Sequence, residues 1–306
     1  MNMSRPAESV RFVSSGQRIL ATVYGRSADR APVVLICAGF SGTQDTPSII
    51  AAAETFAAQG WLAMTFDYRS FGQSDGEPRQ VVSVPRQLDD IHAAIAYLRS
   101  RPDVDPDRVS LWGSSLGGGH VVTVAAGDTR IAGVVAQVPF NGFPKRADAG
   151  GRSTKEAYAL LWTAVRDRVR GWFGQRPLYI KAVGMVGERA VMVGEDASQT
   201  IEVLGSATWR NEVAPRGLLD MMAYRPGKTV HRVQAPLMVC IGEKDLATQG
   251  DTTRPLARDA PRGELHSYPF AHFEIYRADI RGHVLADQVD FLRRALDAEA
   301  IDQAPS

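Results

Sequence analysis

Features of secreted, membrane-bound and nucleic-acid-binding proteins are scarce in this sequence. The 306 residues include only two cysteines, and the formal net charge at pH 7 is +1. Acidic and basic residues are mixed along the whole length, so there is no basic stripe for nucleic acid and no polybasic patch for a membrane. No run of about 18 apolar residues occurs. We therefore expect neither a nucleic-acid nor a membrane partner.

Targeting and redox signals are equally sparse. The first residues lack the charged start and the apolar stretch of about 7 to 15 residues that a secretory signal needs, so we expect a soluble, cytoplasmic protein. Arginine far outnumbers lysine, as in proteins from GC-rich bacterial genomes. Cys37 and Cys240 each lie inside a short apolar run, which predicts two buried thiols and no disulfide. The sequence leaves the oligomeric state open, a homodimer included.

The hydrophobic pattern predicts an α/β fold. Hydrophobic residues make up 44% of the chain, enough for a large core, and apolar runs of strand length alternate with segments of helical period. The predicted strands are a hairpin over residues 9–25 and the runs Val33–Cys37, Leu62–Phe66, Val109–Trp112, Ile131–Val138 and Leu237–Ile241. Helical periodicity marks residues 47–58, 84–98 and 284–296. A mainly parallel sheet flanked by helices follows.

A long stretch without a core strand interrupts this alternation. We expect residues 143–234 to form an inserted cap, and residues 1–142 and 235–306 to form the catalytic domain. Ser153 and Glu156 predict a capping box at the start of an amphipathic helix. The apolar stripe of that helix comprises Tyr158, Leu161, Trp162, Val165, Val169 and Trp172. Two paired short strands are predicted around Gly187, and a further helix over residues 218–224.

The most informative local motif is Gly113-Ser114-Ser115-Leu116-Gly117, between a predicted strand and a helix-like segment. A strand that turns sharply into a helix strains its backbone, so the residues two before and two after the central one must be small. The pattern is typical of a nucleophile elbow, which projects a serine hydroxyl. Ser114 is the neighbouring alternative, but only Ser115 has glycine at both positions. Ser115 is therefore the predicted nucleophile.

A serine hydroxyl needs a base that accepts its proton and an acid that orients the base. A carboxylate in the loop after the strand Leu237–Ile241 would reach the carboxyl end of the sheet. Asp245 is the predicted acid, and Glu243 is the competing candidate. His272 follows a later short apolar run and completes the chain order serine, acid, histidine, so it is the predicted base.

The other histidines fit the role of base less well. His92, His120 and His283 lie on predicted helices, while His231 and His266 do not follow a strand in a loop. No HxH or HExxH spacing occurs, so we predict no metal site.

Catalysis at Ser115 would also need backbone N–H groups that stabilise an oxyanion, each worth about 3 kcal/mol. The amide of Leu116, next to the nucleophile, is one predicted donor. The second is expected from the segment 38–42, and we favour Phe40. An ordinary glycine turn is the alternative interpretation of that segment, and the absence of an HGGG sequence argues against that subgroup of lipases and esterases.

With these motifs the sequence resembles the α/β-hydrolase superfamily over nearly its whole length, particularly dienelactone-hydrolase-like and prolyl-oligopeptidase-like members. The segment 66–74 is similar to the loop after the fourth strand in that family, with Ser70 in place of a glycine. The segment 272–276 is similar to the histidine loop, although Ala271 stands where many members have glycine. The resemblance implies an eight-stranded, mostly parallel sheet, a cap after the sixth strand and no cofactor.

The leading hypothesis is a serine hydrolase that cleaves an ester, thioester or lactone bond of a small-molecule acyl substrate. A carbon–carbon bond hydrolase or a cofactor-free haloperoxidase could use the same three residues. A non-catalytic small-molecule receptor on a hydrolase scaffold is the alternative from another class. Trp209 and Met221, in the expected cap, are predicted to line an apolar substrate pocket.

Overall fold

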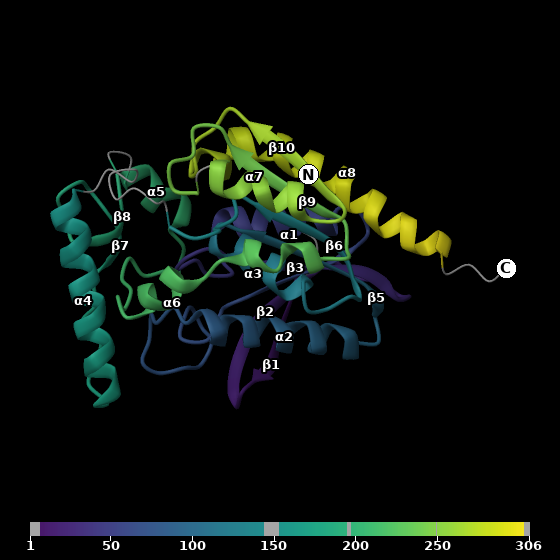
Figure 1. Cartoon of the computed structure of the whole chain (residues 1–306). Helices are drawn as coiled ribbons and strands as arrows, with labels where there is room; N and C mark the ends of the chain where they lie inside the picture. Colours follow the sequence, from purple (N-terminus) through teal and green to yellow (C-terminus); the bar gives the residue numbers. More distant parts are fainter. Residues whose placement is uncertain (1–6, 144–152, 195–196, 249, 303–306) are drawn as a thin grey trace.

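A single eight-stranded sheet organises the chain (Figure 1). The computed structural model describes residues 7–143, 153–194, 197–248 and 250–302. The strands are β1 (Ala7–Ser14), β2 (Gln17–Tyr24), β3 (Ala31–Cys37), β4 (Leu62–Phe66), β5 (Val104–Ser114), β6 (Ile131–Gln137), β9 (Leu237–Gly242) and β10 (Gly263–Tyr268). Their order is β1-β2-β4-β3-β5-β6-β9-β10. The β1–β2 and β2–β4 pairs are antiparallel and the other neighbours are parallel, which confirms the predicted α/β sheet.

Helices cover both faces of this sheet, so its central strands carry apolar residues on both sides. The flanking helices are α1 (Pro47–Ala57), α2 (Val84–Ser100), α3 (Leu116–Ala125), α7 (Gly250–Asp259) and α8 (Ala278–Asp302). On one face α1 contacts α8, and on the other α2 contacts α3 (Figure 1). Every residue of β3, β4, β6 and β9 is consequently buried. Among the described helices, none is long and apolar enough to cross a membrane.

The opening hairpin and the two cysteines agree with the sequence prediction, whereas one strand of the sheet was not predicted. The opening hairpin turns at Ser15 and Gly16, both with positive φ, and Cys37 and Cys240 are free, buried thiols. The edge strand β10, which precedes the short apolar run before His272, was missed because most of its own residues are exposed and form no apolar pattern.

The segment between β6 and β9 carries its own small elements. They are α4 (Thr154–Trp172), β7 (Lys181–Gly184), β8 (Ala190–Val193), α5 (Ala197–Leu204), α6 (Gly217–Ala223) and the short helices η2 (Pro226–Lys228) and η3 (Val230–Arg232). The capping box of Ser153 and Glu156 is present at the start of α4. β7 and β8 pair in parallel register rather than as a hairpin. Residues 144–152 and 195–196 of the predicted cap lie outside the described residues.

A buried ion pair fastens the loop after β4 to α2. Arg69 Nη2 lies 2.6 Å from Asp90 Oδ1, and the amide of Arg69 donates to Asp90 Oδ2 at 3.0 Å. Arg69 also donates to Ser14 Oγ at 2.7 Å. The next residue in this loop, Ser70, adopts a φ of 71°, a conformation that glycine adopts without steric cost.

We predict that Asp90→Ala destabilises the fold by about 3–5 kcal/mol, because it leaves the Arg69 guanidinium buried without its carboxylate. The free energy of unfolding in urea measures this. Asp75→Ala is the control, since Asp75 pairs with Arg18 at the surface, where water screens the charges. Equal effects of the two substitutions would contradict the prediction.

Candidate active site

The predicted nucleophile lies at the tight turn between β5 and α3. Ser115 has φ 53° and ψ −118°, a backbone conformation that residues other than glycine rarely adopt. A Cβ on Gly113 would overlap the carbonyl of Gly117, and a Cβ on Gly117 would overlap the carbonyl of Cys37. Only glycine therefore fits at the two positions that flank the serine by two residues. The strained turn leaves the side chain of Ser115 partly accessible.

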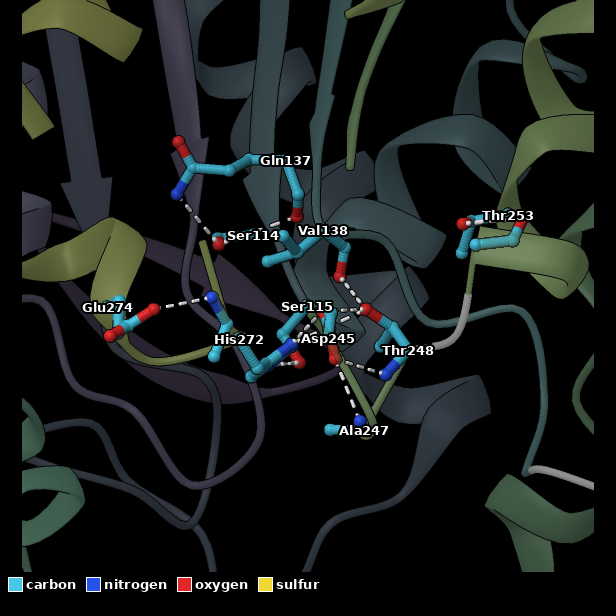
Figure 2. A network of polar contacts seen from close by, with 12 residues as sticks. Ser114, Ser115, Gln137, Val138, Asp245, Ala247, Thr248, Thr253, His272 and Glu274 are labelled. Carbon is cyan, nitrogen blue, oxygen red and sulfur yellow. Dashed lines mark hydrogen bonds and ion pairs between the residues drawn. The ribbon is translucent and has the colours of Figure 1, made fainter. Parts of the chain in front are cut away.

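The structure brings His272 to this serine from a distant part of the chain (Figure 2). His272 Nε2 lies 3.1 Å from Ser115 Oγ, and His272 Nδ1 lies 2.7 Å from Asp245 Oδ2. A carboxylate can only accept, so Nδ1 carries the proton and Nε2 presents a lone pair to the serine hydroxyl. The amide of Ala271 donates to Glu274 Oε2 at 2.7 Å and holds the loop of the histidine.

Asp245 is buried and receives four hydrogen bonds. The amides of Ala247 and Thr248 donate to its Oδ1, both at 2.8 Å. Its Oδ2 accepts from Thr248 Oγ1 at 2.7 Å and from His272. Burial alone would raise the pKa of this carboxyl, but the charge of His272 and these hydrogen bonds outweigh burial and hold the pKa below its ordinary value. Asp245 therefore stays ionised at neutral pH.

The competing candidates lie elsewhere. Ser114 is buried, and its Oγ lies 2.8 Å from the hydroxyl of Tyr276 and accepts from Gln137 Nε2 at 3.1 Å. Glu243 is exposed, two residues before the buried Asp245. Neither side chain contacts His272 through a hydrogen bond in the described part of the chain.

His120, the histidine nearest to the elbow in sequence, has a structural environment. Its Nδ1 lies 3.0 Å from the hydroxyl of Tyr224 and its Nε2 lies 3.1 Å from Gln87 Oε1. Complete burial lowers the pKa of His120 to about 3, so the ring is neutral at ordinary pH. This histidine joins α2, α3 and the end of the insert.

Within the described residues, no group of three His, Cys, Asp or Glu side chains is arranged as metal ligands.

The two predicted oxyanion donors come from the residue after the serine and from the loop after β3. Leu116 is the first residue of α3, so its amide has no acceptor within the helix. The loop after β3 passes close to the nucleophile, because a Cβ on Gly39 would stand 3.2 Å from Ser115 Cβ. Among the described residues the amide of Phe40, next in that loop, donates to no protein acceptor. Neither amide has a backbone acceptor among the described residues, as the prediction of an oxyanion donor requires.

A small cavity opens at Ser115 and His272, and most of its wall is apolar. The loops of the site and two residues of the insert line it: Ala38, Gly39, Phe40, Gly42, Thr46, Ser48, Ile49, Ser114, Ser115, Met192, Leu204, His272, Phe273 and Tyr276. No carboxylate, lysine or arginine side chain is part of this described lining. The cavity therefore suits an uncharged group.

The two residues predicted to line the pocket lie outside it. Trp209 is partly buried beside the loop after β3, where its Nε1 donates to Ser41 Oγ at 3.4 Å. Met221 is buried within α6. The insert does reach the cavity, but through Met192 of β8 and Leu204 of α5. Hydrophobicity alone identified large side chains of the insert and could not tell which of them face the serine.

Asp45 ties the insert to the loop that carries Phe40, and sequence analysis missed it. Its Oδ1 accepts from the hydroxyls of Thr43, Ser206 and Thr208, each at 2.7 Å. The amide of Thr208 donates to Oδ2 at 3.1 Å. Burial raises the pKa of Asp45, but these hydrogen bonds outweigh it and lower the pKa. These contacts join segments far apart in sequence, and no local pattern indicates them.

Thr248 was also missed, although its position after Asp245 is a local signal, since aspartate side chains commonly accept from amides two or three residues later in the chain.

Comparison with known proteins identifies the family of the chain. The family model described as serine aminopeptidase, S33, matches residues 28–277. The "Quorum-quenching protein AidA" of Acinetobacter baumannii is 36% identical over 297 residues, covering 96% of each chain. "Thiohydrolase apmlB" of Arthrinium phaeospermum is 31% identical over 305 residues, covering 94% of this chain and 96% of the relative.

The fold is shared with solved structures. The crystal structure of the α/β hydrolase GrgF from Penicillium superposes with a TM-score of 0.81 at 22% identity, covering 95% of this chain and 99% of that one. The chain therefore belongs to the serine aminopeptidase (S33) family of α/β-hydrolases and is an enzyme of the hydrolase class.

Proposed function

We propose that this hydrolase cleaves a carboxylic ester, thioester or lactone through an acyl-enzyme intermediate on Ser115. The observation that carries the proposal is the continuous hydrogen-bonded chain from Asp245 through His272 to Ser115 Oγ, with distances of 2.7 and 3.1 Å. A hydroxyl becomes a useful nucleophile at neutral pH only when an oriented base takes its proton.

Acylation follows from the orientation of these groups. Ser115 Oγ attacks the acyl carbon while His272 Nε2 accepts its proton, and Asp245 stabilises the imidazolium that forms. The amides of Phe40 and Leu116 stabilise the negative charge on the former carbonyl oxygen. His272 then gives the proton to the departing alcohol or thiol. In the second step water attacks the acyl group while His272 accepts its proton, the bond between the acyl carbon and Ser115 Oγ breaks, and His272 returns the proton to Ser115 Oγ as the acid is released.

The lining of the cavity supports an uncharged, apolar acyl group. Met192 and Leu204 contribute apolar side chains from the insert, so the insert acts as a cap over the acyl group. One relative carries the name thiohydrolase, which makes a thioester an appropriate test substrate beside an aryl ester and a lactone. The three bond types share the same acyl chemistry and differ only in the leaving group.

Ser115→Ala should reduce kcat/KM for nitrophenyl acetate to the level of the uncatalysed reaction, because the attacking hydroxyl is gone. The variant should unfold in urea like the wild type. Turnover equal to that of the wild type would contradict the assignment of the nucleophile.

The rate should rise with pH between about 5 and 8, because His272 must be neutral to accept the serine proton. The lowered pKa of Asp245 keeps this carboxylate ionised over the same range, so protonation of the aspartate does not account for the rise. A profile of kcat/KM that is flat over this range would exclude a histidine base.

The two carboxylates of the loop after β9 should differ sharply. Asp245→Asn should lower kcat on the order of 10³–10⁴-fold, because an amide cannot hold the required tautomer and charge of His272. Glu243→Gln is the matched control and should leave kcat nearly unchanged, since Glu243 is exposed. The reverse ranking in steady-state kinetics would transfer the role of acid to Glu243.

A series of nitrophenyl esters of increasing acyl length tests the cavity. Each methylene buried against its wall contributes about 0.8 kcal/mol, so kcat/KM should rise about fourfold per carbon until the cavity is full. Leu204→Ala should flatten this rise. Leu219→Ala removes the same side chain from a partly buried position in the insert outside the cavity and should preserve it. Equal slopes for the two variants would remove Leu204 from the acyl site.

A further inference from the structure

The exposed face of α4 carries an apolar seam. Tyr158, Trp162, Val165, Val169 and Trp172, here called the α4 seam, follow one another at steps of four, three, four and three residues. That spacing is the a/d pattern of a helix that packs against another helix over two heptads. The three aromatic side chains of the seam are 68%, 69% and 76% exposed. An amphipathic helix ordinarily buries its apolar face.

The helix cannot turn the seam inward, because its opposite face is fastened to the insert. Asp167 is fully buried and accepts from the amide of Leu178 at 2.7 Å and from Arg216 Nε at 2.7 Å. Arg168, beside it, lies 2.6 Å from the carboxylate of Asp220. Rotating α4 would break these contacts and bury charge without partners. The seam is therefore left exposed to solvent, on a helix that forms the left edge of the molecule in Figure 1.

The exposed area is on the scale of an interface. An aromatic side chain buries about 150–250 Å², so the seam with the adjacent Phe173, which is 76% exposed, offers on the order of 500 Å² of apolar surface. The largest apolar patch of a typical monomer is about 300–600 Å² and is commonly functional. A stable interface buries about 800 Å² on each partner. The seam supplies more than half of that.

The pattern of the seam fits a second copy of the same helix. Tyr158 and Trp172 lie seven residues on either side of Val165, and Leu161 and Val169 lie four residues on either side, so an antiparallel copy centred on Val165 would place Tyr158 opposite Trp172 at both ends. This is the self-complementarity that a twofold interface requires. Antiparallel packing also brings Glu156 near the basic end of the partner helix, which contains Arg170, and opposes the two helix dipoles. Parallel packing would instead place Arg170 beside its own copy.

We infer that the α4 seam is a homodimer interface, in which two copies of α4 pack antiparallel about a twofold axis at Val165. A narrow a/d seam favours a helical partner over a lipid surface, for which a broad apolar face is typical. The dimer would fix the insert of each copy through the anchoring contacts of Asp167.

Cross-linking tests this geometry directly. Val165→Cys places one thiol on the twofold axis, so its copies should meet and form a disulfide-linked dimer under mild oxidation. Thr163→Cys is the control on the same helix, away from the seam. Cys37 and Cys240 are fully buried and should not interfere. We expect Val165→Cys to cross-link at least tenfold faster than Thr163→Cys, and equal rates would overturn the proposal.

Sedimentation at about 1 and 100 µM supplies an independent readout. The wild type should be dimeric at the higher concentration, and Trp162→Glu should weaken the dimer at least tenfold. Val13→Glu, which adds the same charge at an exposed apolar position on β1, should not weaken it. A wild type that stays monomeric overturns the proposal. If that monomer co-sediments with vesicles of phosphatidylcholine and phosphatidylglycerol, the partner of the seam is a lipid surface.

Discussion

The backbone at Ser115 is the constraint on which the site depends. A positive φ at a residue with a side chain is costly, and it persists only where the surroundings fix it. Here Gly113 and Gly117 allow β5, α3 and the end of β3 to approach so closely that no Cβ fits between them. The same turn aims the serine hydroxyl at His272 and frees the amide of Leu116, so nucleophile and oxyanion donor arise from one local geometry.

A buried network of polar side chains ends at Ser114, next to this turn. Trp112 Nε1 can only donate, and it does so to Gln288 Oε1 at 2.8 Å. The side-chain Nε2 of Gln288 then donates to Gln137 Oε1, and the side-chain Nε2 of Gln137 donates to Ser114 Oγ. The hydroxyl of Ser114 is in turn hydrogen-bonded to the hydroxyl of Tyr276, in the loop that follows His272. The donor-only indole thus sets the direction of the whole network, which links the elbow to the loop of the histidine. Burial raises the pKa of Tyr276, so its hydroxyl stays protonated within this network.

The sequence predicted what depends on local pattern. The five-residue elbow, the order of serine, acid and histidine, and the buried strands each follow from periodicity or from a steric requirement at one turn. What it could not predict depends on tertiary contact. Asp45 acts through Ser206 and Thr208, more than a hundred and fifty residues away, and no local signal marks it.

The insert illustrates the same limit. Trp209 and Met221 have the hydrophobicity expected of a pocket wall, but Met192 and Leu204 reach the cavity instead. The apolar stripe of α4 was recognised as amphipathic, and the structure turns most of it outward. Periodicity identifies an apolar face without saying which surface covers it.

Covalent trapping at the serine tests the central claim most directly. The wild-type enzyme would be treated with a fluorophosphonate, digested and examined by peptide mass spectrometry. The account predicts one phosphonyl group per chain, carried by Ser115, with labelling strongly slowed in His272→Ala because the hydroxyl then lacks its base. Modification of Ser114, or a wild-type chain that remains unlabelled, would contradict it.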